Sequence, residues 1–182
     1  MQDTIRLKDR EFSLYIRETE IVDAITRIAA EIERDVQGKN PLFVGILNGA
    51  YMFVAELMSK LPPVYELTFA AYSSYRGVKS EGIVKELLPV RGDAHDRIVV
   101  LLEDVIDTGL TMQYVMHKLK ESGIRDVRLA TMLFKPGALR CDLKPDYVGL
   151  EIGNDFIVGF GLDYDGLGRT SRNIYRILNN NK

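Results

Sequence analysis

The sequence predicts an α/β protein made of one domain, residues 1–182, in which a parallel sheet is flanked by helices. The main observation is an alternation along the chain. Short apolar runs typical of strands buried on both faces are followed by segments whose apolar residues recur at helical spacing. Strands that alternate with helices in this way usually run parallel and are wrapped by the helices. The second observation is length, since 182 residues are enough to bury a substantial core.

The first third of the chain contains a helix, a buried strand and a second helix. Apolar residues share one helical face over residues 21–36, and Gly38 follows as a typical helix end. The apolar run Leu42–Leu47 is expected to form a strand, followed by a turn and by a helix over roughly Met52–Lys60. The Pro62-Pro63 pair ends that helix, because proline lacks the backbone N–H that a helix needs.

A strand expected at Tyr65–Tyr72 leads into a long polar segment, Ser73–Glu86. This segment contains Gly77 and Gly82 and has no strong period. A long loop in a compact domain is often functional, so one interpretation is a lid that closes over a site. A plain surface hairpin is the alternative, and this segment alone favours neither.

The second half of the chain continues the alternation. A strand at Ile98–Leu102, a helix at Met112–Gly123 and a strand at Val127–Phe134 follow one another. Tyr147–Ile152 and Phe156–Leu162 are further strands expected on the same evidence. In sheets of this kind ligands bind beyond the carboxyl ends of the strands, so a site is expected in the turns that follow them.

The composition is that of an ordinary globular protein and excludes some functions. Hydrophobic residues make up 46% of the sequence and charged residues 27%, and the net charge is −2. Because this charge gives no general attraction to nucleic acid or to an anionic membrane, we expect neither as a partner. No apolar stretch approaches the length of a membrane span. The single cysteine, Cys141, excludes an internal disulfide and is typical of a reducing compartment, so we expect a cytoplasmic protein.

A strand, two acids and a threonine-glycine turn follow one another in the segment RIVVLLEDVIDTGLT, residues 97–111. The turn Asp107–Thr111 lies between a strand and the start of a helix, where free backbone N–H groups and the helix dipole favour phosphate binding. Thr108 and Thr111 add hydroxyl donors, and Gly109 permits close approach of the backbone. A single acid at a strand end often marks only the exit of the chain into solvent. The whole set predicts a phosphate cradle beside two acids.

These residues resemble the phosphoribosyl pyrophosphate (PRPP) motif of the type I phosphoribosyltransferases, and in particular of their hypoxanthine-guanine branch. Related branches typically carry two aspartates where this chain has Glu103-Asp104. The resemblance implies the fold of that family, with a small hood built from N- and C-terminal segments. Further matches occur in the family's order over about residues 43–176, namely Ser74-Tyr75, Lys135, Phe156–Gly159, Leu162–Tyr164 and Arg169.

The activity that this resemblance implies is transfer of ribose 5-phosphate from PRPP to N9 of a 6-oxopurine. Pyrophosphate is released and IMP or GMP is formed, a reaction of purine salvage. The partners would be these small molecules and further copies of the chain in a homodimer or homotetramer. The residues leave open whether hypoxanthine, guanine or xanthine is preferred.

The resemblance also assigns the PRPP side of the site. Glu103 and Asp104 are expected to hold the ribose hydroxyls and a Mg²⁺ ion, which prefers hard oxygen ligands and offsets charge on the leaving pyrophosphate. Asp163 is expected near a second Mg²⁺. The 5-phosphate would be bound by Thr108, Gly109, Leu110 and Thr111, and pyrophosphate by Leu47, Asn48, Gly49 and Arg169.

Asp107 is expected to act as the general base at purine N7, because a carboxylate there can accept the proton that the ring must lose. Its structural alternative is an Asx-type turn onto loop amides. Lys135 is donor-only and so would bind the O6 carbonyl of hypoxanthine or guanine but not the amino group of adenine. Phe156 offers a flat apolar face to the purine, and the backbone carbonyls near Ile157 and Asp163 would accept its N–H groups. Outside such a pattern, Lys135 would be solvated, Phe156 would be core and Arg169 a surface charge.

Two positions depart from the family. Many members carry lysine in the turn where this chain has Asn48, and a basic residue where it has Leu110, so only the backbone of each is expected to bind. Neither change removes a catalytic group. Ser74 and Tyr75 are the family's match in the polar segment and would belong to the lid.

Other functions fit the sequence less well. A DNA-binding repressor on the same fold would need a further domain, for which 182 residues leave no room, and an RNA-binding attenuator should show a basic face. A phosphatase or receiver domain would centre on an acid after its first strand, whereas the first buried strand here ends at Asn48.

Overall fold

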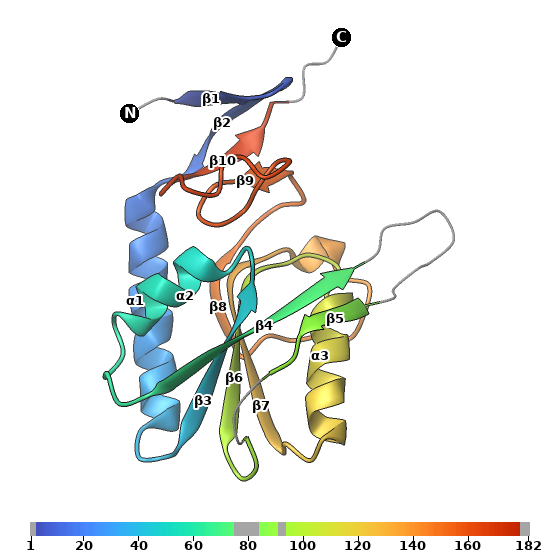
Figure 1. The fold of residues 1–182 in the computed structure, drawn as a ribbon. Helices are drawn as coiled ribbons and strands as arrows, with labels where there is room; N and C mark the ends of the chain where they lie inside the picture. The colour runs from blue at the N-terminus through green and yellow to red at the C-terminus, as the bar shows by residue number, and fades with distance from the viewer. Residues whose placement is uncertain (1–2, 75–83, 91–93, 179–182) are drawn as a thin grey trace.

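The computed structural model describes residues 3–74, 84–90 and 94–178, and its larger sheet has the predicted parallel arrangement (Figure 1). Six strands lie in the order β5-β4-β3-β6-β7-β8, and all except β5 run parallel. The edge strand β5 pairs antiparallel with β4. The six strands are β3 (Pro41–Leu47), β4 (Glu66–Ser74), β5 (Val84–Leu88), β6 (Ile98–Ile106), β7 (Asp126–Phe134) and β8 (Tyr147–Glu151).

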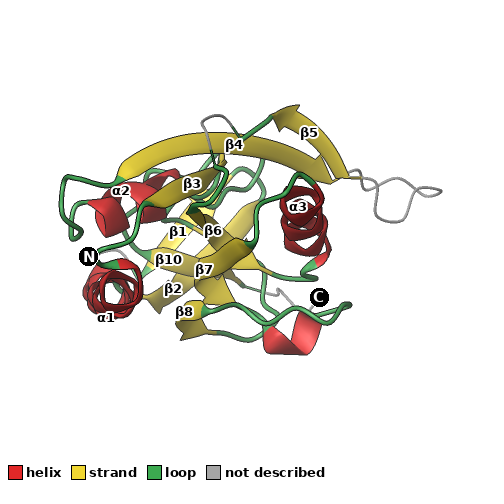
Figure 2. Cartoon of the chain, turned by 90° about the horizontal axis from the view of Figure 1, so that it is seen from below, coloured by secondary structure: helices red, strands yellow, loops and turns green. Residues whose placement is uncertain are grey.

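Helices cover both faces of this sheet (Figure 2). Helices α1 (Glu18–Val36) and α2 (Tyr51–Met58) lie on one face and α3 (Leu110–Glu121) on the other, so the core has two halves. Four isoleucines of α1 recur every three or four residues and are fully buried, which confirms the predicted face: Ile21, Ile25, Ile28 and Ile32. Burying a side chain of this size contributes about 1.5–3 kcal/mol. A short 3-10 turn, η1 (Pro136–Ala138), follows β7.

A second, antiparallel sheet lies at one end of the large sheet and forms the expected hood (Figure 1). Its order is β1-β2-β10-β9, so the N-terminal strands pair with the C-terminal ones. Phe12, Val158 and Tyr175 are buried between these strands as a small core of their own. The strands are β1 (Thr4–Leu7), β2 (Arg10–Ile16), β9 (Ile157–Val158) and β10 (Ile174–Ile177).

The sequence predictions for Phe156–Leu162 and Ser73–Glu86 differ from the structure. The strand expected at Phe156–Leu162 is wrong beyond Val158, because Gly159, Phe160 and Gly161 all adopt positive φ and turn the chain. The segment Ser73–Glu86 is not a loop at its ends, since β4 extends to Ser74 and β5 begins at Val84. These ends form a hairpin stem; residues 75–83, including Tyr75, lie outside the described part of the chain, so the lid stays a prediction.

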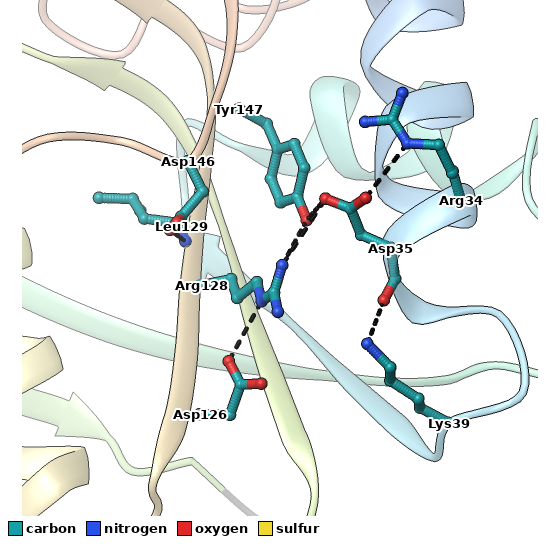
Figure 3. Close-up of polar contacts among 8 residues, drawn as sticks. All are labelled: Arg34, Asp35, Lys39, Asp126, Arg128, Leu129, Asp146 and Tyr147. Atoms are coloured by element: carbon teal, nitrogen blue, oxygen red, sulfur yellow. Dashed lines mark hydrogen bonds and ion pairs between the residues drawn. The ribbon is translucent and has the colours of Figure 1, made fainter.

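A polar network ties α1 to the starts of β7 and β8 (Figure 3). The Tyr147 hydroxyl donates to Asp35 Oδ2 at 3.0 Å, and Arg128 Nη1 lies 3.6 Å from the same oxygen. Arg128 also donates to Asp126 Oδ1 at 3.1 Å. The hydrogen bond from Tyr147 is the main reason why the pKa of Asp35 is lowered. Within the described residues, no helix is both long and apolar enough to span a membrane.

Candidate active site

A cavity of about 590 Å³ opens where the carboxyl ends of β3, β4, β6 and β7 approach the hood. Most of its walls come from the turns that the sequence singled out. Predicted site residues that line it are Leu47, Gly49, Glu103, Asp104, Asp107, Thr108, Gly109, Thr111, Lys135, Phe156, Ile157, Asp163 and Arg169. The cavity therefore brings together residues that are more than a hundred positions apart in the sequence.

The phosphate cradle has the local geometry that its sequence requires. Gly109 is the N-cap of α3 and adopts a left-handed conformation, φ +78°. A side chain there would also meet Cys141 Sγ and a methyl group of Leu139, each 2.9 Å from the position of a Cβ. Thr108 lies beside this cap, and its carbonyl accepts the backbone N–H of Arg140 at 3.0 Å. The segment after Lys135 thus holds the turn in place. The first N–H groups of α3 have no partner within the helix and point out of its N-terminal end, towards the cavity.

Glu103 and Asp104 lie side by side in the last part of β6, which extends to Ile106 rather than ending before the acids as predicted. Asp104 Oδ1 accepts the Val105 N–H at 2.7 Å. Glu103 Oε2 is buried and has no hydrogen-bond partner among the described residues. Burial, and then the neighbouring charge of Asp104, raise the pKa of Glu103 well above its ordinary value. Burial also raises the pKa of Asp104, although its hydrogen bonds and the charge of Arg169 oppose this.

The turn after β3 packs directly on these acids. A Cβ on Gly49 would lie only 1.6 Å from Asp104 Oδ2, so no other residue fits here without movement. The Leu47-Asn48 peptide bond is cis. Leu47 and Gly49 line the cavity, whereas Asn48 is exposed and does not. Leu110 likewise lies outside the lining, between Gly109 and Thr111.

The other end of the cavity contains a buried lysine. Lys135 Nζ donates to Asp107 Oδ2 at 3.3 Å and to the Asp155 carbonyl at 3.0 Å. Phe156 is 47% exposed beside it, although a phenylalanine of this size is more often core. Its ring packs against Phe12 and Tyr164 of the hood, with centroids 6.4 and 6.0 Å away. The hood thus holds an aromatic ring at the cavity.

Arg169 and Asp163 form a tight pair at the hood side. Arg169 Nη2 lies 2.6 Å from Asp163 Oδ1, and Nη1 donates to the Gly161 carbonyl at 2.7 Å. Asp163 Oδ2 accepts the Gly166 N–H at 2.6 Å. Both oxygens of Asp163 are therefore engaged within the hood. Among the residues described, no three side chains of the types that bind metals cluster together, so Asp163 does not join Glu103 and Asp104.

Seven residues that line the cavity were not among the predicted site residues: Ile46, Tyr72, Val105, Ile106, Met112, Asn154 and Leu162. The position of Asn154 could have indicated a site residue, because it lies in the turn between two expected strands. No feature of the sequence indicates Tyr72 as a site residue, since a tyrosine at the end of an apolar strand usually belongs to the core. Of the residues assigned to the lid, Ser74 is the last residue of β4 and Tyr75 is not described.

The comparison with protein families agrees with this geometry. The model of the phosphoribosyl transferase domain matches residues 15–165. The chain belongs to the phosphoribosyltransferase family. It has the type I fold of that family, and the matched range includes Glu103, Asp104, the turn Asp107–Thr111 and Lys135.

Individual relatives define the branch. The chain is 42% identical to the hypoxanthine-guanine phosphoribosyltransferase of Streptococcus mutans over 148 residues, 81% of this chain and 82% of the relative. It is 40% identical to that of Lactococcus lactis over 151 residues, 82% of each chain. A crystal structure of a hypoxanthine phosphoribosyltransferase from Staphylococcus aureus superposes with a TM-score of 0.86 at 29% identity and covers 91% of both chains. The transferase is thus a member of the hypoxanthine-guanine branch.

Proposed function

We propose that this transferase moves the 5-phosphoribosyl group of PRPP to N9 of hypoxanthine or guanine. The bond from C1 of the ribose to the pyrophosphate oxygen breaks, the bond from C1 to N9 forms, and the purine loses one proton. The products are IMP or GMP and pyrophosphate. The observation that carries this proposal is one cavity that combines a phosphate cradle, two acids and a buried lysine beside an exposed aromatic ring.

The cradle and the acids would hold the phosphoribosyl group. Thr108, Gly109 and Thr111 line the cavity at the start of α3 and would bind the 5-phosphate through backbone N–H groups and hydroxyls, a function that suits a helix N-terminus. Glu103 and Asp104 would accept the ribose hydroxyls. Leu47, Gly49 and Arg169 also line the cavity, and Arg169 and the backbone of the Leu47–Gly49 turn would bind pyrophosphate.

The two acids also fit a Mg²⁺ ion. Glu103 Oε2 has no partner among the described residues, and the pKa of both carboxyls is raised, so the protein compensates the charge of the pair only in part. Mg²⁺ is usually held by one or two carboxylates together with substrate oxygens and water, so a third protein ligand is not required. When bound, the ion would supply Lewis-acid stabilisation of the departing pyrophosphate. The proposed role of Asp163 near a second ion would require its pair with Arg169 to open.

The purine would lie between Lys135, Asp107 and Phe156. Lysine has three N–H donors, and two of those of Lys135 are used by Asp107 and the Asp155 carbonyl, which leaves one for O6. The ring of Phe156 would stack on the purine, and the carbonyls of Ile157 and Asp163 would accept N1–H and the 2-amino group. Asp107, held by Lys135, would accept the proton from N7 as N9 attacks C1.

A transfer assay tests this function. Labelled hypoxanthine, guanine, xanthine, adenine and orotate are each mixed with PRPP and the protein, with and without Mg²⁺, and nucleotide formation is followed. We expect product from at least one of the 6-oxopurines only with Mg²⁺, and none from adenine or orotate. Product only with adenine or orotate, or no product with any of the five bases, would contradict the proposal.

The setting of the enzyme is a further part of the proposal. The substrates are small molecules, and we propose that the transferase acts in the cytoplasm as a homodimer or homotetramer. A related structure, of the hypoxanthine phosphoribosyl transferase of Trypanosoma cruzi, is 30% identical with a TM-score of 0.85 and addresses the role of the C-terminal region of that protein in its oligomeric state. Light scattering of the purified chain measures its mass directly, and a monomer at micromolar concentration would contradict this part.

A further inference from the structure

A chain of polar contacts lies beside the cavity and is separate from the PRPP motif. The Tyr72 hydroxyl donates to Glu86 Oε2 at 3.3 Å, and Lys118 Nζ donates to the same oxygen at 2.8 Å. Tyr72 and Glu86 are opposite each other in the antiparallel register of β4 and β5, and Lys118 belongs to α3. One carboxylate oxygen therefore joins two strands to the helix whose first turn forms the phosphate cradle.

Tyr72 itself forms part of the cavity wall, together with Ile46 and Met112. Its side chain packs against the half of the core that lies under α3. In the parallel register of β3 and β4, Ala71 pairs with Leu47, so Tyr72 is level with the start of the turn after β3. The ring consequently stands between that turn and the start of α3, the two places proposed to bind the anionic parts of the substrate.

We propose that Tyr72 is a further substrate-binding residue, whose ring forms the wall against the phosphoribosyl group, and that Glu86 and Lys118 are positioning residues that fix this ring. The inference rests on the proposed function for the identity of the ligand. It assigns a role to three residues that lie outside the motif.

The charges of this chain of contacts suit a cavity for anions. Glu86 alone would repel a phosphate, but Lys118 compensates its charge at 2.8 Å. Burial, and then the charge of Glu86, raise the pKa of Tyr72 to about 12. The hydroxyl is therefore a donor throughout the neutral range, and the carboxylate is held from both sides. Lys118 keeps Glu86 in place and also prevents its charge from acting on the ligand.

The first test changes the ring. Ribose 5-phosphate, which can occupy the cradle without metal or purine, is titrated by calorimetry into the wild type, Tyr72→Phe and Tyr72→Ala. Loss of a packed aromatic wall should raise the Kd of Tyr72→Ala about tenfold or more. Tyr72→Phe keeps the ring and loses only the hydroxyl, so its Kd should rise about two- to fivefold. In the transfer assay the KM for PRPP should rise while the KM for purine stays constant.

The second test separates position from charge. Lys118→Met leaves Glu86 uncompensated and should weaken ribose 5-phosphate binding about three- to tenfold at low salt, an effect that salt reduces. Adding Glu86→Gln to Lys118→Met removes the repulsive charge and should restore most of the affinity. Lys120→Met is the matched control, because it removes the same charge from the exposed side of the same helix end. Its affinity should equal that of the wild type.

The outcomes distinguish this inference from the proposed function. Unchanged ribose 5-phosphate affinity in folded Tyr72→Ala, or an equal loss in purine affinity, would overturn the role of Tyr72. No recovery in the double variant would overturn the role of the charge pair. If Tyr72→Ala does not fold, Tyr72→Phe and the charge variants decide. A wild type that binds ribose 5-phosphate in this way but transfers nothing would refute the function and leave the binding role intact.

Discussion

Lys135 Nζ lies 3.3 Å from Asp107 Oδ2, so the residue proposed to select the purine is paired with the residue proposed to accept its proton. The pair follows from the sheet. Ile106 and Phe134 are partners in the parallel register of β6 and β7 and are the last residues of these strands. Asp107 and Lys135 directly follow them. The Lys135 N–H also donates to the Ile106 carbonyl at 2.9 Å. Because each side chain holds the other, a useful variant must remove one property of the pair at a time.

Asp107→Asn removes the charge but keeps an oxygen that can accept the Lys135 hydrogen bond. If Asp107 is the proton acceptor, turnover should fall by ~10²–10⁴-fold, the usual span for a general acid–base group. PRPP affinity should change little, because the backbone of the cradle is intact. Rapid-quench measurement of the chemical step checks this, with Asp142→Asn on the exposed loop as control. A variant that keeps more than half of the wild-type rate of that step would end the assignment.

Lys135→Met keeps an apolar stem of similar length and removes the donor to O6. Loss of a charged donor costs ~1.5–3 kcal/mol, or ~10–150-fold in kcat/KM. The loss should affect hypoxanthine and guanine alike and leave the KM for PRPP nearly unchanged. Steady-state kinetics with both purines measure it, and Lys144→Met, an exposed lysine in the following loop, is the control. Loss of guanine use alone would place Lys135 at the 2-amino edge instead.

The parts of the fold that follow from the sequence are those with a strong local pattern. The α1 helix is predictable because its isoleucines recur on one face, and β3, β6 and β7 because their apolar runs are unbroken. The hood strands are not located individually by such patterns. In β2, Phe12, Leu14 and Ile16 alternate with polar residues, a period-two signal that is present but weak. The turn after Val158 cannot be predicted from the sequence, because Phe160 adopts a positive φ, which is uncommon for a phenylalanine and which no sequence pattern indicates.

The residues of the site also differ in how well the sequence predicts them. The acids and the cradle are contiguous between Glu103 and Thr111, so their chemistry is recognisable from the sequence alone. Tyr72 is not recognisable in this way, because its place at the cavity depends on Glu86 and Lys118, which meet it only through the pairing of β4 with β5 and the packing of α3. The exposure of Asn48 likewise depends on the folded turn, since the path of the chain decides which of its three residues faces the cavity.

Glu103→Gln should stabilise the ligand-free protein and weaken PRPP binding. The folded state raises the pKa of Glu103 above its ordinary value of about 4.5. The folded protein therefore holds its proton more tightly than the unfolded chain, and stability is lost as pH rises through the folded pKa. Glutamine cannot ionise, and its amide can donate to Asp104 as the protonated acid does. The gain in Tm should be absent near pH 4 and grow towards pH 7.5.

The size of this gain follows from the linkage. A tenfold preference for the protonated form corresponds to ~1.4 kcal/mol, and 1 kcal/mol shifts the Tm of a protein of this size by roughly 2–4 °C. Differential scanning calorimetry at the two pH values measures the difference, with Glu11→Gln, an exposed acid of β2, as control. The same change in Tm at both pH values would show that ionisation of Glu103 does not oppose folding.

Gly109→Ala should damage stability and phosphate binding together, and Gly38→Ala separates the two effects. Both glycines have similar left-handed φ values, +78° and +74°, so each alanine should cost ~1–2 kcal/mol in backbone strain. Only at Gly109 would the new Cβ meet other groups, Cys141 Sγ and Leu139 at 2.9 Å, whereas nothing lies within 4 Å at Gly38. Relief of that clash requires the cradle or the supporting segment to move, at a further cost of ~1–3 kcal/mol.

The binding measurement then decides whether the support of the cradle matters for function. Ribose 5-phosphate affinity should fall about tenfold or more in Gly109→Ala, since every N–H of the turn must keep its direction to reach one phosphate. Gly38→Ala should bind like the wild type at a temperature where both variants are fully folded, because Gly38 follows α1 at the far end of the sheet. If both variants lose stability equally and both retain affinity, the contact of Cys141 and Leu139 with Gly109 has no part in holding the phosphate turn.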